Sequence, residues 1–305
     1  MSEIDNYGMR SFLGEEVMKI IRRDTGPAAS SKRCLVCMHR CLPVVVFVGV
    51  FFLIIMMAGF PRAEKKYLFL GFAMGKDSQT VPVGWEHLQY LGSGENAVSL
   101  VKEGTRTVLH MESLRSASGM LKRVNGTGEP RVNLEEYPVL VWSWKVNRTV
   151  GMAIETRKDR NDSAGRVRVI FGQGQRITEQ APEIEKLAKY FGVTIPQAEP
   201  SGFKIDYIWA TWAEKDTILD YPGGRHHKMI VIERGNEKAN RWVWEKRNLF
   251  EDFQTCFNAD PPGLAGVVVL TDTDQTNEGV EAWYGSIVFM KDDHRMGTEQ
   301  TGDSP

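Results

Sequence analysis

Short runs of alternating apolar and polar residues recur along the chain from about residue 97 onward. They are rich in β-branched and aromatic side chains, which favour extended strands. We expect strands at Ala97–Lys102, Arg106–Glu112, Val139–Val146, Val167–Phe171, Tyr207–Trp212, Met229–Glu233, Val267–Thr271 and Ser286–Met290. Clusters of Gly, Pro, Asn and Asp separate these runs, and no long helical pattern lies between most of them. The pattern predicts an all-β, jelly-roll-like antiparallel β-sandwich rather than an α/β fold.

Alternation within one run predicts which side chains face the core. Val167, Val169 and Phe171 should point inward, and Arg168 should point to the other face. A helical pattern interrupts the strands between Pro182 and Gly192, where apolar residues recur at three- and four-residue spacing. We therefore expect one inserted helix that packs on the sandwich.

A continuous apolar segment, Leu42–Phe60, precedes the strand-rich region. Its nineteen residues would form a helix about 28 Å long, close to the hydrocarbon thickness of a bilayer. It has no polar stripe, which a buried core helix normally keeps. We predict a transmembrane helix that acts as an uncleaved signal anchor. A secretory signal peptide that starts at Met38 is the alternative, and both interpretations export the large domain.

Cysteine positions indicate the orientation of this segment. Cys34, Cys37 and Cys41 precede it, whereas the large domain contains only Cys256. Free thiols suit a reducing cytosol, so we place the amino-terminal tail there and the large domain in the periplasm, as a single-pass protein of the bacterial inner membrane. The expected organisation is a cytosolic tail at 1–41, the membrane segment at 42–60, a linker with a first strand region at 61–84, the β-sandwich at 85–291 and a disordered tail at 292–305.

Composition narrows the functional classes. The 305-residue chain is 42% hydrophobic and 25% charged, which is typical of a globular protein. Its formal net charge of -1 offers no basic field for a polyanion, so we expect no nucleic-acid partner. The chain lacks a Gly-x-Ser-x-Gly elbow, a phosphate-binding P-loop and a His-Glu-x-x-His zinc motif. Its sequence therefore favours a non-catalytic protein over an enzyme.

Several aromatic, basic and acidic motifs occur in a fixed order along the large domain. They are Trp142-Ser143-Trp144, Arg166-Val167-Arg168, Tyr207-Ile208-Trp209, Arg247-Asn248, Thr271-Asp272-Thr273-Asp274 and Trp283-Tyr284-Gly285. This ensemble resembles an exported bacterial family, the domain of unknown function number 3047, over roughly Trp85–Met290. The resemblance implies export and a sandwich domain, but it supplies no activity and no catalytic residues. The chain departs from the family at Asn161-Asp162, where a pair of aspartates is usual.

The motifs provide candidate ligand-binding residues. Trp142 and Trp144 would lie about 6.6 Å apart on one strand face, a spacing at which they could stack on sugar rings. They could equally fill the sandwich core, since apolar residues flank them. The full set of ligand-binding candidates is Trp142, Trp144, Arg168, Trp209, Asp272, Asp274 and Tyr284.

Asp272 and Asp274 follow an apolar strand, where unpaired carboxylates would be costly. We expect them either to pair with an arginine, from Arg166, Arg168 or Arg247, or to bind a cation. The metal interpretation is a calcium site formed by the oxygens of Asp272, Asp274, Asn277 and Glu281, which does not follow the EF-hand pattern. No other cofactor is expected.

Two functional classes remain from the sequence. The first is a non-catalytic, membrane-anchored module that binds a glycan of the cell envelope. The second is a glycan-processing enzyme in which Asp272 and Asp274 supply the acid and the base, although two residues on one strand face approach a sugar from the same side. A structural subunit that joins an envelope protein complex through its membrane helix is a third alternative.

Overall fold

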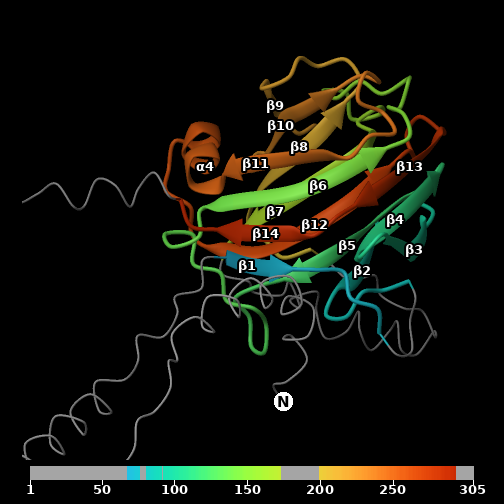
Figure 1. Ribbon diagram of the computed structural model, residues 1–305. Helices are drawn as coiled ribbons and strands as arrows, with labels where there is room; N and C mark the ends of the chain where they lie inside the picture. Colours follow the sequence, from blue (N-terminus) through green and yellow to red (C-terminus); the bar gives the residue numbers. More distant parts are fainter. Residues whose placement is uncertain (1–66, 76–79, 91, 173–198, 293–305) are drawn as a thin grey trace, which may run out of the picture. The chain divides into compact units, whose positions relative to one another are not determined.

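The computed structural model describes residues 67–75, 80–90, 92–172 and 199–292 (Figure 1). The apolar segment Leu42–Phe60, the helix expected between Pro182 and Gly192 and both chain termini lie outside these ranges. Within the described ranges, no helix has the length and apolar character needed to cross a membrane.

Two seven-stranded sheets make up the described domain. Sheet A contains β1 (Tyr67–Leu70), β3 (Ala97–Glu103), β4 (Arg106–Leu114), β6 (Val139–Val146), β11 (Val243–Asn248), β13 (Gly279–Tyr284) and β14 (Ile287–Met290). Sheet B contains β2 (Glu86–Gln89), β5 (Ala117–Arg123), β7 (Ser163–Phe171), β8 (Phe203–Ala210), β9 (Ile218–Asp220), β10 (His227–Arg234) and β12 (Leu264–Asp272). Figure 1 shows β6 and β11 of sheet A in front of β7 and β8 of sheet B.

The strands pair largely between distant parts of the chain. Sheet A has the order β1-β14-β6-β13-β4-β3, and β11 pairs with the other edge of β6. Sheet B has the order β2-β5-β12-β7-β8-β10-β9. The pairing of β1 with β14 and of β5 with β12 joins strands that lie far apart in the sequence.

The inner faces of the two sheets form one apolar core, which confirms the sandwich. Val167, Val169 and Phe171 of β7 belong to this core, whereas Arg168 points to the outer face of sheet B, as the alternation predicts. All nine residues of β7 are buried, so it is the direction of the side chains that alternates between the two faces and not their burial. The outer face of sheet B is therefore defined by the residues that lie between these core positions.

The expectation of purely antiparallel sheets is wrong at one pair of strands. β8 and β10 run parallel, with Ile230 opposite Tyr207. After β8 the chain crosses to the short edge strand β9, which is antiparallel to β10, and β10 then enters the sheet between β8 and β9. This insertion makes β10 run in the same direction as β8.

A short helix, α4 (Leu249–Phe257), explains the Arg-Asn motif. The Asn248 side chain caps it by accepting hydrogen bonds from the backbone N–H groups of Phe250 and Glu251. Arg247 pairs with Asp252 in the first turn, where the Nε–Oδ2 distance is 2.9 Å. The motif therefore fixes the junction between β11 and α4, and its role is structural.

Candidate functional site

The aromatic side chains expected to bind a ligand lie in the core. Trp142, Trp144, Trp209 and Tyr284 are all buried between the sheets. The rings of Trp142 and Trp144 contact each other edge to face, with centroids 5.7 Å apart. The core interpretation of this Trp-x-Trp pair is thus confirmed, and these rings present no surface on which a sugar could stack.

A second Trp-x-Trp pair faces the opposite way: Trp244 lies on the neighbouring strand β11, and Trp242 directly precedes that strand. In the pairing of β11 with β6, Val243 lies opposite Trp144 and Trp244 lies opposite Ser143. The two pairs are offset by one position, so Trp244 points to the outer face of sheet A, and Trp242, two residues earlier, contacts Lys145 on the same face. Lys246, two residues after Trp244 and therefore on the same face, is the sequence signal that could have identified this outward pair.

Four strands of sheet A align aromatic and cationic side chains across this outer face. Trp283 of β13 lies opposite Lys145 of β6 on one side and His110 of β4 on the other. The Lys145 ammonium lies 4.3 Å from the ring centroid of Trp283 and 5.3 Å from that of Trp242. His110 stacks on Trp283 with a centroid separation of 4.6 Å. Lys145 therefore makes cation–π contacts with a tryptophan on each side of it.

Two carboxylates bind the polar groups of these aromatic and cationic side chains. Glu103 accepts a hydrogen bond from Lys145 at 2.9 Å and one from the indole N–H of Trp242 at 2.5 Å. Glu281 pairs with His110 at 2.9 Å. We call this surface the outer platform, formed by Glu103, His110, Lys145, Trp242, Trp244, Glu281 and Trp283.

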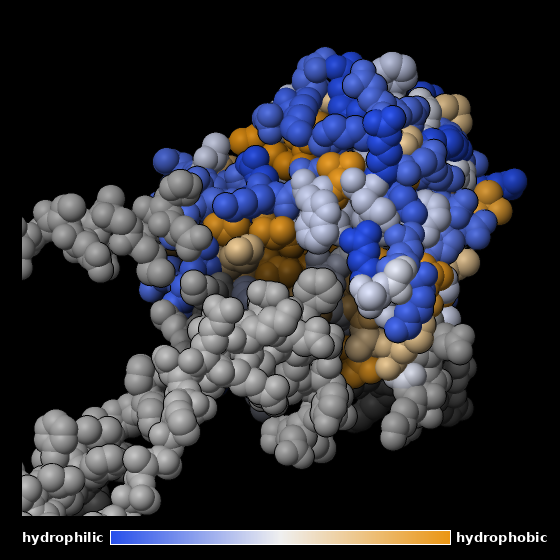
Figure 2. All heavy atoms as spheres, viewed as in Figure 1, coloured by the Kyte–Doolittle hydropathy of each residue, from blue (hydrophilic) through white to orange (hydrophobic). Residues whose placement is uncertain are grey.

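Trp244 is the accessible ring of the outer platform. It is 61% exposed, whereas Trp85, Trp142, Trp144 and Trp209 are buried. Figure 2 shows side chains of intermediate hydropathy among hydrophilic ones near the middle of the face seen in Figure 1. An indole left in water beside fixed polar groups is an arrangement typical of a binding surface.

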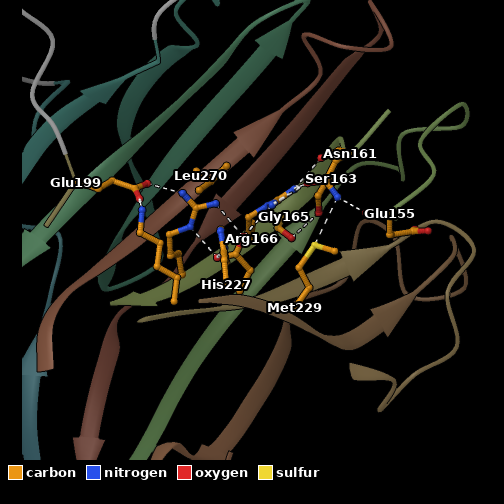
Figure 3. Close-up of polar contacts among 12 residues, drawn as sticks. Glu155, Asn161, Ser163, Gly165, Arg166, Glu199, His227, Met229 and Leu270 are labelled. Atoms are coloured by element: carbon orange, nitrogen blue, oxygen red, sulfur yellow. Dashed lines mark hydrogen bonds and ion pairs between the residues drawn. The ribbon is translucent and has the colours of Figure 1, made fainter. Parts of the chain in front are cut away.

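The outer face of sheet B carries a buried ionic network instead (Figure 3). Arg168 binds both carboxylate oxygens of Asp206, at 2.7 and 2.9 Å, and Arg166 binds the same carboxylate at 2.8 Å. The Nε2 atom of His227 lies 2.9 Å from Oδ1 of Asp206, and burial lowers the pKa of His227. Burial raises the pKa of Asp206, but Arg168 and His227 outweigh it and hold that pKa well below its ordinary value.

Glu199 extends the network from the other side of Arg168. It pairs with Arg168 and Lys204 and accepts a hydrogen bond from the Tyr90 hydroxyl at 2.8 Å. Burial opposes its charge, but Arg168 and Lys204 lower the pKa of Glu199 to about 2. Arg168, expected to contact a ligand, is thus fully engaged by two carboxylates.

Three carboxylates gather at one end of sheet B. Among the residues that the structure describes, oxygens of Asp162, Asp272 and Asp274 lie within 4.8 Å of one another. The third carboxylate of this cluster is Asp162, where the sequence had suggested Asn277 and Glu281. Glu281 instead lies on the outer face of sheet A and pairs with His110. The sequence-based set therefore contained two of the three carboxylates.

The arginine partner expected for Asp272 is not found among the described side chains. Its Oδ1 atom is buried without a hydrogen-bond partner, because Arg166 and Arg168 bind Asp206 and Arg247 binds Asp252. Burial raises the pKa of Asp272 well above its ordinary value. Arg166 opposes the shift, and Asp162 and Asp274 add to it.

A model of the DUF3047 family, described as a protein of unknown function, matches residues 83–288. This chain belongs to the DUF3047 family. The matched range includes both the outer platform and the three carboxylates, so both are parts of the DUF3047 domain. No curated protein matches the chain.

Solved structures resemble the DUF3047 domain only weakly. A family 11 carbohydrate-binding module of the cellulosomal cellulase Lic26A-Cel5E of Clostridium thermocellum has a TM-score of 0.36 at 8% identity, covering 75% of this chain and 97% of that chain. A family 30 carbohydrate-binding module of cellulase Cel9D-Cel44B from the same organism has a TM-score of 0.30 at 11% identity, covering 77% and 96%. The glycoside hydrolase domain of Endo-D from Streptococcus pneumoniae R6 has a TM-score of 0.27 at 7% identity, covering 68% and 22%. TM-scores this low carry no argument about this chain.

Proposed function

We propose that this protein is a non-catalytic glycan-binding module of the bacterial cell envelope and that the outer platform binds the glycan. The observation that carries the proposal is the exposed indole of Trp244 on the same face of sheet A as Trp242 and Trp283, with Lys145 between the latter two rings. The C–H face of a pyranose packs on an indole through dispersion and burial of apolar area. Its hydroxyls then need hydrogen-bonding partners close by.

The charged side chains of the platform supply such partners. Lys145 donates, Glu103 and Glu281 accept, and each is only half-buried in the sheet surface. Because Glu103 and His110 already hold neighbouring groups in place, the platform loses little side-chain entropy when a ligand binds. A rigid aromatic surface with fixed polar groups suits a neutral, hydroxyl-rich ligand better than an anion or a flat apolar one.

Two matched tryptophans provide the test. Trp244 on the platform and Trp212 after β8 are both 61% exposed. Replacing either ring with alanine therefore removes a similar area of exposed indole. The full chain should bind soluble glucan or N-acetylated oligosaccharides in a titration monitored by tryptophan fluorescence. Trp244→Ala should weaken binding by about 10- to 100-fold, the equivalent of losing one buried aromatic side chain.

Trp212→Ala should leave the affinity unchanged. Equal losses in the two variants, or no saturable binding of any of these oligosaccharides by the unmodified chain, would contradict the glycan platform. A loss confined to Trp212→Ala would move the ligand away from sheet A.

A glycan-processing enzyme is the second candidate, favoured by the raised pKa of Asp272 beside Asp274. A general acid needs such a pKa. However, Asp272 is only 9% exposed, and the oxygens of all three carboxylates lie within 4.8 Å, closer than the pairs that flank a glycosidic bond. Release of reducing ends from the same oligosaccharides, abolished in Asp272→Asn, would establish the enzyme instead.

The location we propose follows from the apolar segment Leu42–Phe60. This segment anchors the protein in the inner membrane, and the DUF3047 domain lies in the periplasm, where envelope glycans are accessible. In that arrangement the partners are the membrane, a glycan and, through the helix and the tail before it, a further envelope protein.

A further inference from the structure

We propose that Asp162, Asp272 and Asp274 bind a divalent cation, which we assign as calcium. This site lies at the end of sheet B and shares no residue with the outer platform on sheet A. The cation proposal and the glycan proposal can therefore fail separately.

The backbone brings the three carboxylates together from two strand ends. Asp162 directly precedes β7, and Asp272 is the last residue of β12, where it pairs with Ser163. Asp274 lies two residues further, in the connection that leads to β13. Carboxylate oxygens from all three lie within 4.8 Å of one another, close enough to share one ion.

An unsatisfied oxygen points to a missing ligand. Asp272 is 9% exposed, and its Oδ1 atom is buried without a hydrogen-bond partner. Buried carboxylate oxygens without partners are rare in folded proteins because desolvation is not repaid. A cation between the three side chains would supply the interaction that the described residues do not.

Protein charges do not neutralise the cluster. Arg166 is the cation that acts on Asp272, but its terminal nitrogens bind Asp206 and Asn161. It makes no hydrogen bond with the cluster in the described structure, so three carboxylates face one guanidinium whose hydrogen bonds go to other residues. Repulsion of this kind is what a bound divalent ion removes.

Neighbouring donors orient the carboxylates. Asp162 accepts hydrogen bonds from the backbone N–H and the hydroxyl of Thr276, at 2.7 and 2.6 Å. Asp274 accepts hydrogen bonds from Ser93 and Gln275. Outer contacts of this kind fix the direction of metal-binding oxygens and leave their remaining lone pairs free.

The all-oxygen donor set selects a hard cation. Carboxylates without histidine or thiolate favour calcium or magnesium over zinc or copper. Calcium accepts irregular geometry and completes its shell with water, whereas magnesium demands a regular octahedron. A bound calcium would join the start of β7 to the end of β12 and, through Ser93, to the segment before β3.

Calorimetric titration of the full-length protein, stripped with EDTA and dialysed, tests the site. Calcium chloride should bind at one site, with a dissociation constant on the order of 10⁻⁵ to 10⁻³ M, and more tightly than magnesium chloride. A saturating excess should also raise the thermal unfolding midpoint by several degrees, because the ion binds only the folded chain. Asp272→Asn should weaken calcium binding at least tenfold and abolish the shift of the midpoint.

Asp220→Asn is the matched control, since this β9 aspartate is 82% exposed and pairs only with Lys228 among the described groups. It should bind calcium like the unmodified chain. If Asp272→Asn does not fold, Asp274→Asn carries the same forecast. The proposal is overturned if neither ion binds at about 10 mM, or if Asp272→Asn or Asp274→Asn folds and binds calcium with unchanged affinity.

Discussion

Glu245 places a carboxylate on the core side of β11. It accepts a hydrogen bond from the indole N–H of Trp144 at 3.2 Å and is largely buried. Burial raises its pKa from 4.5 to about 7, and Glu233 adds to the shift. Trp144 and the cationic groups of Lys215 and Lys238 oppose it without restoring the ordinary value.

This pKa makes the stability of the domain depend on pH. The folded chain holds a proton on Glu245 that the unfolded chain has released, so this contribution is complete below pH 4.5 and is lost as pH rises toward 7. Glu245→Gln keeps the hydrogen-bond acceptor and removes the titration. Urea unfolding at about pH 5 and about pH 8 should show the unmodified chain losing on the order of 1 kcal/mol more than the variant across this interval. Parallel stability profiles for the two proteins would contradict the assignment.

The site residues show how far the sequence alone could lead. Alternation along β7 correctly predicted that Arg168 leaves the core. It could not decide between the two faces for Trp142 and Trp144, because apolar flanking residues occur both in cores and under aromatic surfaces. Local sequence reasoning alone also could not settle the outward direction of Trp244. It depends on the one-residue offset between β6 and β11, and register between distant strands is not encoded locally.

At the scale of the element, α4 depends on its amino-terminal cap. Asn248→Ala removes the acceptor for two backbone N–H groups and should lower the free energy of unfolding by about 1 kcal/mol. Asn248→Ser keeps an acceptor at the same position and should recover most of this loss. Chemical denaturation of the three proteins measures the difference, and equal losses in the Ala and Ser variants would show that the cap is not the cause.

Strand prediction succeeded where β-branched residues alternate and failed where they do not. β6 was predicted with its observed bounds because Val139–Val146 is rich in valine and tryptophan. β5 was missed because Ala117–Arg123 contains Ser, Gly, Lys and Arg, yet it pairs with the central strand β12 and is mostly buried. Gly119 is required there, since a Cβ atom would lie 2.8 Å from the carbonyl oxygen of Val269. Tertiary packing rather than local propensity creates this strand.

At the scale of the whole molecule, the proposed location can be tested with a reporter fusion. An enzyme that is active only after export, fused behind Pro305, should be active in cells that express the full chain. Deleting residues 42–60 should abolish this activity while leaving the amount of fusion protein similar. Activity that survives the deletion, or reporter folding in the cytosol, would remove the anchor and export from the proposed function.

The pairing of β1 with β14 also sets the order in which the domain can fold. Tyr67 lies opposite Met290, and β14 separates β1 from β6, where Val288 lies opposite Val141. During synthesis the first strand therefore has no partner until the last strand has left the ribosome. Contacts between such distant residues carry a large loop-closure entropy and place the domain among slow folders, in the range of about milliseconds to seconds. The β1 edge of sheet A can therefore form only where the beginning and the end of the described domain meet.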